Sequence, residues 1–288
     1  MPELPEVEAL AADLRGRLKD RAITKIHLAQ FSALKTFDPP LSALEGTLVD
    51  QVSRHGKFLD IEASGVHLII HLARAGWIRW RDEVPSIPPK PSPKSTLAAR
   101  IVLDSGEGLD VTEAGTKKSL AIYVVRSPAD VPGIATLGPE PMSDDFTVDV
   151  LGRILEEAGR KQLKGVLRHQ GTIAGIGNAY SDEILHAARM SPYKPADSLS
   201  EEELQTLYAV LRGTLADAVA RSTGLAASEL KGEKKSHLAV HGRTGLPCPV
   251  CGDIVREVSF ADSSLQYCPT CQTGGKPLAD RRMSKLRK

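Results

Sequence analysis

Apolar and polar positions follow two different periods along this chain. Residues 6–19 carry apolar side chains at helical spacing, among them Val7, Leu10 and Leu14, and this spacing predicts an amphipathic helix. Between residues 22 and 125, short runs alternate between apolar and polar positions and are separated by turn residues such as Gly65 and Gly115. The N-terminal half is therefore predicted to be one helix followed by mostly antiparallel β-strands.

After the segment LGPEP the period changes from two to about 3.6 residues. Ser198 or Ser200, followed by Glu201, is a typical helix start. Helices are predicted over residues 146–159, 161–169, 178–189 and 199–220. Near the C-terminus, IVREVSFADSSLQY predicts a β-hairpin, and residues 274–288 form a basic tail expected to lack regular structure.

Composition and charge exclude few classes of protein. The chain of 288 residues has room for two or three domains, and its longest apolar runs are strand-sized. Because no basic leader or signal-like apolar run stands at the N-terminus, we expect a cytosolic protein. The net charge is +1, but from Ala226 onward 11 Lys and Arg face 6 Asp and Glu. A basic end of this kind is weak support for nucleic-acid binding, because many basic tails are merely solvated.

All four cysteines lie near the C-terminus as two CxxC pairs separated by 16 residues. Two such pairs at this distance favour tetrahedral thiolate ligation of zinc, whereas disulfides would be out of place in a reducing compartment. Four thiolates leave no open coordination position, so the metal is predicted to be one structural Zn²⁺. The predicted ligands are Cys248, Cys251, Cys268 and Cys271.

A glycine-rich turn precedes one of the predicted helices, in the stretch QGTIAGIGNAYSDEI. Gly175 and Gly177 lead into a helix that is predicted to start near Asn178. A helix start offers backbone N–H groups and a positive dipole end to an anion such as a DNA phosphate. By itself, however, the pattern is more typical of an ordinary glycine-rich interhelical turn than of phosphate binding.

Several motifs together resemble one known family. The start MPELPEVE, the linker LGPEP, the stretch QGTIAGIGNAYSDEIL, and HGRTGLPCPVCG followed by YCPTCQ occur in the order found in the formamidopyrimidine-DNA glycosylase and endonuclease VIII family, from residue 1 to about 272. The resemblance implies an α+β fold. Its parts would be an N-terminal helix and antiparallel β-sandwich (1–137), a helix-two-turn-helix domain (138–240), a zinc-finger β-hairpin (241–273) and a basic tail (274–288). The implied partner is damaged DNA, bound by a cytoplasmic monomer that would associate with the nucleoid in a bacterium.

The resemblance also implies catalytic residues. Pro2, exposed when Met1 is removed, would be the nucleophile, and its amine has a reference pKa of roughly 7.7–8.0, so a neutral fraction exists near pH 7. Glu3 matches the family's proton-transferring glutamate and Glu6 its supporting carboxylate. Lys57 matches a hairpin lysine that contacts a phosphate near the lesion, although it could be only a surface lysine beside a turn.

DNA-binding positions are matched in part and changed in part. Asn178, preceded by Gly177, matches the family's phosphate-binding asparagine. The family's zinc-hairpin arginine is replaced by Ser263, which loses a charge-assisted contact to phosphate. Arg74 stands where a void-filling methionine is usual. The expected arginine and phenylalanine of another loop are replaced within TEAGTKKSL, where Lys117 and Lys118 remain possible phosphate contacts.

These observations favour a base excision repair glycosylase that also cleaves abasic sites by β/δ-elimination. The alternative is a catalytically weak protein that binds damaged DNA on the same fold. A zinc-finger transcription regulator fits less well, because one hairpin module without a recognition-helix pattern offers no base-reading side chains. The changed positions around the extruded nucleotide predict that abasic-site cleavage outlasts activity on 8-oxoguanine.

Overall fold

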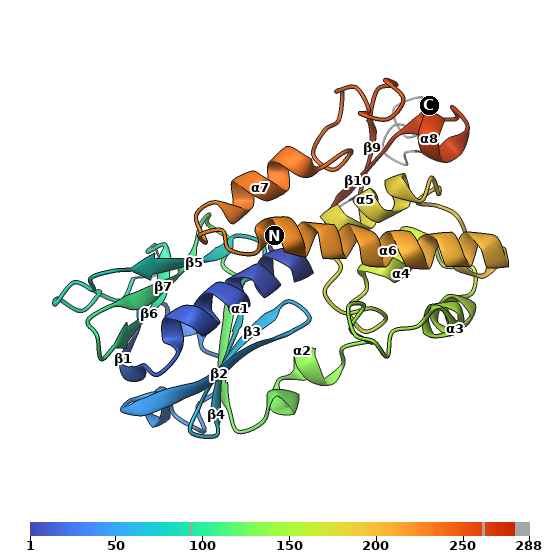
Figure 1. Ribbon diagram of the computed structural model, residues 1–288. Helices are drawn as coiled ribbons and strands as arrows, with labels where there is room; N and C mark the ends of the chain where they lie inside the picture. Colours follow the sequence, from blue (N-terminus) through green and yellow to red (C-terminus); the bar gives the residue numbers. More distant parts are fainter. Residues whose placement is uncertain (93, 261–262, 280–288) are drawn as a thin grey trace. The chain divides into compact units, whose positions relative to one another are not determined.

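The computed structural model describes residues 1–92, 94–260 and 263–279 (Figure 1). The chain folds into two compact units. The first unit contains Met1–Leu137 and Val219–Lys231, and the second contains Gly138–Ala218 and the described residues from Gly232 onward. No helix among the described residues is long and apolar enough to cross a membrane.

The first unit is built from one long helix and eight strands in a continuous antiparallel order, β5-β7-β6-β1-β2-β3-β4-β8. Strands β1 and β2 pair over only two residue pairs, so two four-stranded halves are joined by a short seam. The elements are α1 (Leu4–Leu18), β1 (Ala22–Leu28), β2 (Thr47–His55), β3 (Phe58–Ala63), β4 (Val66–His71), β5 (Gly76–Arg81), β6 (Leu97–Leu103), β7 (Gly108–Glu113) and β8 (Ala121–Val125), with the short helices η1 (Phe31–Ala33), η2 (Leu41–Leu44), η3 (Pro128–Asp130) and α2 (Pro132–Ala135).

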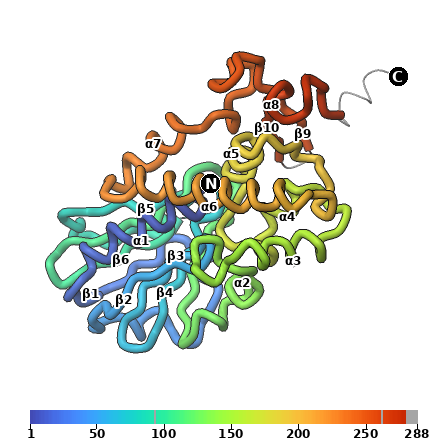
Figure 2. The backbone as a smooth tube through the Cα atoms, turned by 45° about the vertical axis from the view of Figure 1, so that its right-hand side comes forward, coloured from blue at the N-terminus to red at the C-terminus, as the bar shows by residue number. Residues whose placement is uncertain are grey.

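Helix α1 packs against β2 and β3, as the ribbon and tube views both show (Figures 1 and 2). Its apolar positions Val7, Leu10 and Leu14 are buried in one cluster with strand residues such as Leu59 and Ile101. Burying side chains of this size contributes roughly 1.5–3 kcal/mol each. This core holds the start of the chain at a defined position on the sheet.

The second unit consists of helices followed by a β-hairpin. Its elements are α3 (Val148–Ala158), α4 (Leu163–Arg168), α5 (Asn178–Ala187), η4 (Ala196–Ser198), α6 (Glu201–Ser222), α7 (Leu230–His237), β9 (Arg256–Ser259), β10 (Ser264–Tyr267) and α8 (Pro269–Thr273); α6 and α7 cross the boundary to the first unit. Helix α6 begins with the predicted capping box: Ser200 Oγ accepts the Glu203 N–H at 3.2 Å, and Glu203 Oε2 accepts the Ser200 N–H at 2.9 Å. Strand β10 and helix α8 both contact α5.

The predicted fold class is confirmed, as are the long helix and the short strands of the first unit. Helix α7 was not predicted. Its sequence LKGEKKSH has no apolar period, and only Leu230 is buried, in the core of the first unit. Contact of this one side chain with the core thus anchors the start of a helix that the polar pattern does not predict. Residues 280–288 of the predicted basic tail lie outside the described residues.

Candidate functional site

The predicted catalytic residues at the chain start occupy the N-terminal end of α1. Pro2 is buried, whereas Met1 is 50% exposed. Glu3 is the residue that precedes the helix, and its backbone N–H donates to Glu6 Oε2 at 2.8 Å. Both carboxylates are almost fully buried. Glu6 therefore fixes the backbone of Glu3, and with it the peptide that links Glu3 to Pro2.

Lys57 lies in the two-residue turn between β2 and β3, where His55 pairs with Phe58. Gly56 adopts a positive φ of 56°, a conformation that glycine enters without steric cost. Lys57 is buried. Burial and the charge of Lys57 lower the pKa of His71 to about 4, so this imidazole is neutral near pH 7. The side chain of Lys57 is therefore packed against the protein and does not extend into solvent as a surface lysine usually does.

An ion pair that sequence reasoning missed connects α1 to this turn. Arg54 donates from Nε to Glu8 Oε2 at 2.9 Å and from Nη1 to the Gly56 carbonyl oxygen at 2.8 Å. Although burial raises it, hydrogen bonds from Arg54 and Arg15 hold the pKa of Glu8 below its ordinary value. The arginine therefore ties the helix that carries Pro2 to the turn that carries Lys57.

The remaining predicted residues of the first unit lie in loops. Arg74 is exposed in the turn between β4 and β5, directly after Ala73, which has a positive φ of 50°. Lys117 is exposed in the connection from β7 to β8. Lys118 is half-buried, and its Nζ donates to the Glu113 carbonyl oxygen at 2.6 Å. Of these two lysines, Lys118 stabilises its own loop through this hydrogen bond, and Lys117 presents an exposed positive charge.

In the second unit, Asn178 is the first residue of α5, as predicted, and follows Gly177 at the N-cap position. Its Nδ2 donates to the Ser264 carbonyl oxygen of β10 at 2.8 Å, so the side chain holds the hairpin. The preceding turn is organised by Gln170, whose Oε1 accepts the Gly175 N–H at 3.0 Å. Gly175 has a positive φ of 82°, which explains the glycine at this position.

Helix α5 anchors the chain that leads into the cysteine-rich segment. Asp182 is fully buried and accepts hydrogen bonds from Lys164 Nζ at 2.6 Å and His241 Nδ1 at 2.8 Å. The adjacent Glu183 accepts three backbone N–H groups at 2.7–3.0 Å, those of residues 239–241. Buried carboxylates satisfied in this way fix a chain segment firmly. Lys164, which sequence reasoning missed, also donates to the Asn178 carbonyl oxygen at 3.0 Å.

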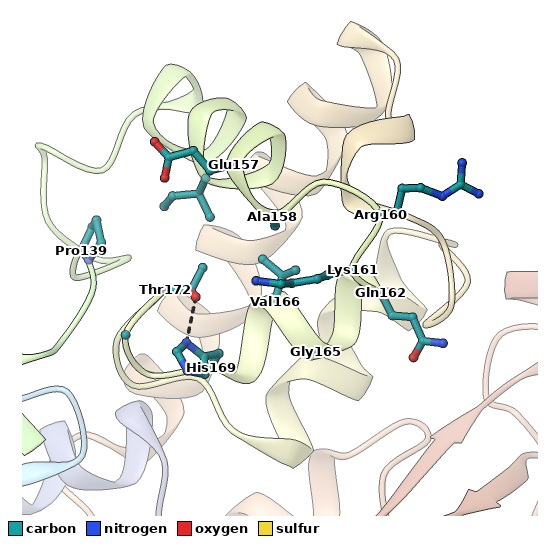
Figure 3. Close-up of a pocket in the computed structure, with 12 residues that line it drawn as sticks. Pro139, Glu157, Ala158, Arg160, Lys161, Gln162, Gly165, Val166, His169 and Thr172 are labelled. Atoms are coloured by element: carbon teal, nitrogen blue, oxygen red, sulfur yellow. Dashed lines mark hydrogen bonds between the residues drawn. The ribbon is translucent and has the colours of Figure 1, made fainter.

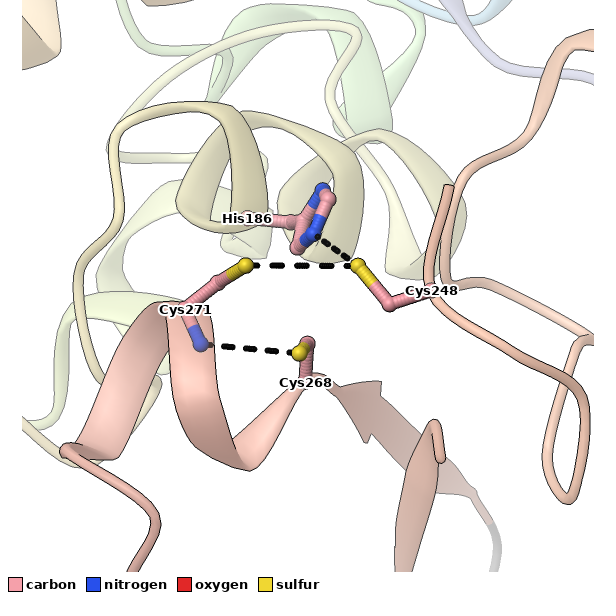
Figure 4. Close-up of side chains that lie close together, drawn as sticks. All are labelled: His186, Cys248, Cys268 and Cys271. Atoms are coloured by element: carbon pink, nitrogen blue, oxygen red, sulfur yellow. Dashed lines mark hydrogen bonds between the residues drawn. The ribbon is translucent and has the colours of Figure 1, made fainter. Parts of the chain in front are cut away.

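Three of the four cysteines, Cys248, Cys268 and Cys271, form a cluster with His186 (Figure 4), and Cys251 lies beside Cys268. Cys248 and Cys271 sulfurs lie 3.9 Å apart, and those of Cys251 and Cys268 lie 3.3 Å apart. His186, near the end of α5, places Nε2 at 3.2 Å from Cys248 Sγ, and its nearest ligand atom and those of Cys248, Cys268 and Cys271 lie within 4.8 Å of one another. These soft donors suit a tetrahedral metal ion. Sequence spacing could not indicate His186, which is 62 residues from Cys248.

A separate cavity of about 880 Å³ lies between α3, α4 and the turn at Gly171 (Figure 3). Its lining includes Val166 and His169, whose Nδ1 lies 2.9 Å from Thr172 Oγ1. Arg160 also lines it, with the guanidinium directed away from the other labelled side chains. No residue predicted for catalysis, DNA binding or metal ligation lines this cavity.

Three family models match consecutive parts of the chain. The formamidopyrimidine-DNA glycosylase N-terminal domain matches residues 1–118 and the H2TH domain of the same family matches residues 137–229. The zinc finger found in FPG and IleRS matches residues 245–274, which contain the cysteine cluster. The fold and the sites thus define a sandwich protein with a helix-two-turn-helix unit and a metal-binding hairpin.

Known proteins match more than half of the chain, and one of them matches nearly all of it. The formamidopyrimidine-DNA glycosylase of Thermus thermophilus is 34% identical over 285 residues, covering 96% of this chain and all of that protein. An uncharacterized formamidopyrimidine-DNA glycosylase-like protein of Mycobacterium tuberculosis is 58% identical over 160 residues, 56% of this chain and 99% of that protein. The chain belongs to the formamidopyrimidine-DNA glycosylase and endonuclease VIII family.

Solved structures agree with this assignment. The crystal structure of the MutM (Fpg) protein from Thermus thermophilus superposes with a TM-score of 0.79 at 33% identity, covering 96% of this chain and all of that one. A complex between Lactococcus lactis Fpg and DNA containing an abasic site superposes with a TM-score of 0.82 at 25% identity, covering 94% of this chain and 99% of that one.

Proposed function

We propose that this chain is a base excision repair enzyme that removes damaged bases from DNA and cleaves the strand at the resulting abasic site. The observation that carries the proposal is the start of α1, where the Glu6 carboxylate holds Glu3 beside Pro2. The enzyme acts as a cytoplasmic monomer on damaged DNA. The abasic-DNA complex of a relative with the same fold supports this choice of ligand.

Pro2 is the nucleophile once Met1 is removed. Its secondary amine attacks the sugar C1′, the bond from C1′ to the base breaks, and the base leaves with a proton. Glu3, as general acid, then protonates the sugar ring oxygen, the bond from C1′ to that oxygen breaks, and the nitrogen lone pair forms the C1′=N bond of an iminium; in later proton transfers Glu3 acts as general base. The resulting iminium acidifies the C2′ hydrogen, so its removal breaks the C3′–O bond and cuts the strand. A second elimination at the 5′ side releases the sugar.

The remaining residues position DNA and protein. Lys57 binds a phosphate near the lesion, and Gly177 and Asn178 present the start of α5 to the strand. Cys248, Cys251, Cys268 and Cys271 would hold one structural Zn²⁺. Their soft thiol donors and the short distances between their sulfurs suit this ion, which when bound would cross-link the hairpin.

The decisive experiment is reductive trapping. Purified protein whose N-terminus has been defined by mass spectrometry is incubated with abasic duplex DNA and sodium borohydride. We expect a covalent protein–DNA complex, because borohydride reduces the iminium to a stable amine. Pro2→Gly should reduce trapping strongly, and protein that retains Met1 should not trap, because its Pro2 nitrogen is an amide.

A second function has a specific observation in its favour. Ser263 stands in the zinc hairpin and Arg74 in the β4–β5 turn, where the resemblance expects residues that place the extruded nucleotide. A protein with poor placement would bind damaged DNA with little chemistry. The same experiment separates the two functions: binding of abasic DNA without any trapped complex in the Met1-free protein would support the binding protein and exclude the Pro2 mechanism.

A further inference from the structure

We infer that Arg168 is a phosphate-binding residue that supplies the positive charge absent at Ser263. The inference rests on the proposed function, because the anion is a phosphodiester of the bound DNA strand. Sequence reasoning did not single out Arg168, which precedes Ser263 by 95 residues.

The guanidinium of Arg168 lies directly at the hairpin. Arg168 is the last residue of α4 and is exposed. Its Nη1 lies 3.4 Å from Ser263 Oγ and 3.4 Å from Asn178 Oδ1. An arginine side chain thus reaches, from a neighbouring helix, the place where a hairpin arginine at position 263 would begin.

The charge of Arg168 is not neutralised by the described residues. Both of its side-chain partners are neutral oxygens at long distance, and no carboxylate among the described residues pairs with it. Lys164, one turn earlier, shows the opposite arrangement: it is buried and paired with Asp182 at 2.6 Å. A guanidinium has five N–H donors, so two weak contacts leave most of them for an anion.

The positive end of a helix lies beside Arg168. Its Nη1 is 3.4 Å from Oδ1 of Asn178, the first residue of α5, and the first turn of a helix carries a partial positive charge. Asn178 Nδ2 already donates to the Ser264 carbonyl oxygen, so Arg168 is the stronger candidate for the direct phosphate contact.

The backbone of Arg168 is held in place before any ligand arrives. Gln170 Nε2 donates to the Arg168 carbonyl oxygen at 2.9 Å and to the Ile176 carbonyl oxygen at 2.6 Å. Holding the chain in this way lowers the ordering cost of binding. Arginine is also the residue best suited to grip a phosphate with two parallel hydrogen bonds.

The test measures binding of full-length protein to duplex DNA containing a tetrahydrofuran abasic analogue, by fluorescence anisotropy over a series of salt concentrations. We expect Arg168→Gln to weaken binding at least about tenfold, as loss of a charged hydrogen bond predicts. The slope of log affinity against log salt should shrink by about 0.9, the value for one lost phosphate contact. Adding Ser263→Arg to Arg168→Gln should recover affinity and slope.

Arg160→Gln is the matched control, because Arg160 is an exposed arginine of the same unit that lines the separate cavity. Its affinity should stay within about twofold of wild type. Wild-type affinity and slope in Arg168→Gln would overturn the inference. Weaker binding with an unchanged slope and no recovery by Ser263→Arg would also overturn it, because Arg168 would then only order its loop. Failure of wild-type trapping with DNA binding intact would instead reject the Pro2 chemistry.

Discussion

In both the predicted catalytic site at the chain start and the cysteine cluster, side chains contact partners that lie at very different distances in the sequence. Glu6 holds the backbone of Glu3 from three residues away, an arrangement that a capping pattern predicts. His186 reaches Cys248 from another element, with Nε2 at 3.2 Å from that sulfur. When a metal ion is bound to Cys248, a hydrogen bond to that thiolate would stabilise the charged ligand, so we propose that His186 supports the metal site from outside the predicted set of four thiolates.

His186→Phe is expected to weaken zinc binding by about 10- to 100-fold, as loss of a partner of a metal ligand does. Competition with a chromophoric chelator measures this change. The matched control is His237→Gln, a half-exposed histidine of α7. The absorption spectrum of the Co²⁺-substituted protein should keep its four-thiolate character in both variants. Unchanged zinc affinity in His186→Phe would contradict the supporting role.

At the scale of elements, contacts between pairs of elements position the predicted catalytic residues and the cysteine-rich segment. Arg54 ties helix α1 to the β2–β3 turn. Helix α5 holds the C-terminal segment at three places: Asn178 binds Ser264, Asp182 and Glu183 bind residues 239–241, and His186 contacts Cys248. The order of these residues along α5 thus sets how the metal-binding hairpin is held.

Arg54→Gln is expected to lower the free energy of unfolding of the first unit by about 1.5–3 kcal/mol, because the charged hydrogen bonds to Glu8 and to the Gly56 carbonyl oxygen are lost. Urea unfolding followed by tryptophan fluorescence measures it, since both tryptophans, Trp77 and Trp80, belong to this unit.

The control for this change is Arg126→Gln, whose pair with Asp38 is exposed, and it should cost less than about 1 kcal/mol. The pKa of Glu8 is lowered from 4.5 in the folded protein, so the pair stabilises the fold above pH 4.5 and this contribution fades as the pH falls below it. The difference between wild type and Arg54→Gln should shrink over the same interval. A difference independent of pH would contradict the role of the ion pair.

For the whole molecule, the family resemblance places the changed positions around the nucleotide that would be extruded. The position where the resemblance expects a void-filling methionine is the exposed Arg74. Extrusion of a paired base costs a few kcal/mol, which void-filling and pocket contacts must offset. An abasic site demands less of this compensation.

We therefore expect abasic duplex DNA to be cleaved faster than 8-oxoguanine is excised from otherwise identical duplex DNA. Single-turnover rates on the two substrates test this, with single-stranded abasic DNA as a third substrate. In Arg74→Met, the rate of 8-oxoguanine excision should rise relative to the rate of abasic-site cleavage. Equal rates in the wild-type protein would show that other residues fill the void.

Much of the fold follows from local patterns. The predicted helices of the two units begin and end within two residues of the limits of α1, α3, α4, α5 and α6, because apolar period and capping act over a few neighbouring residues. The cysteine spacing is equally local, whereas Pro2, Glu3 and Glu6 were predicted from the family resemblance. Helix α7 was not predicted because its one buried side chain, Leu230, packs into the core of the first unit, and this contact is not visible in the local sequence.

By itself the sequence determined which candidate functional groups the protein carries. These are the proline at position 2, the carboxylates of Glu3 and Glu6, and four thiols at the spacing of metal ligands, and each set lies close together in the sequence. Only the tertiary structure decided which distant side chains join them. Arg54 reaches the turn beside Lys57, Arg168 meets Ser263, and His186 meets Cys248. The physical reason is that these contacts depend on how helices and strands pack, and nothing in local spacing encodes the distance between packed elements.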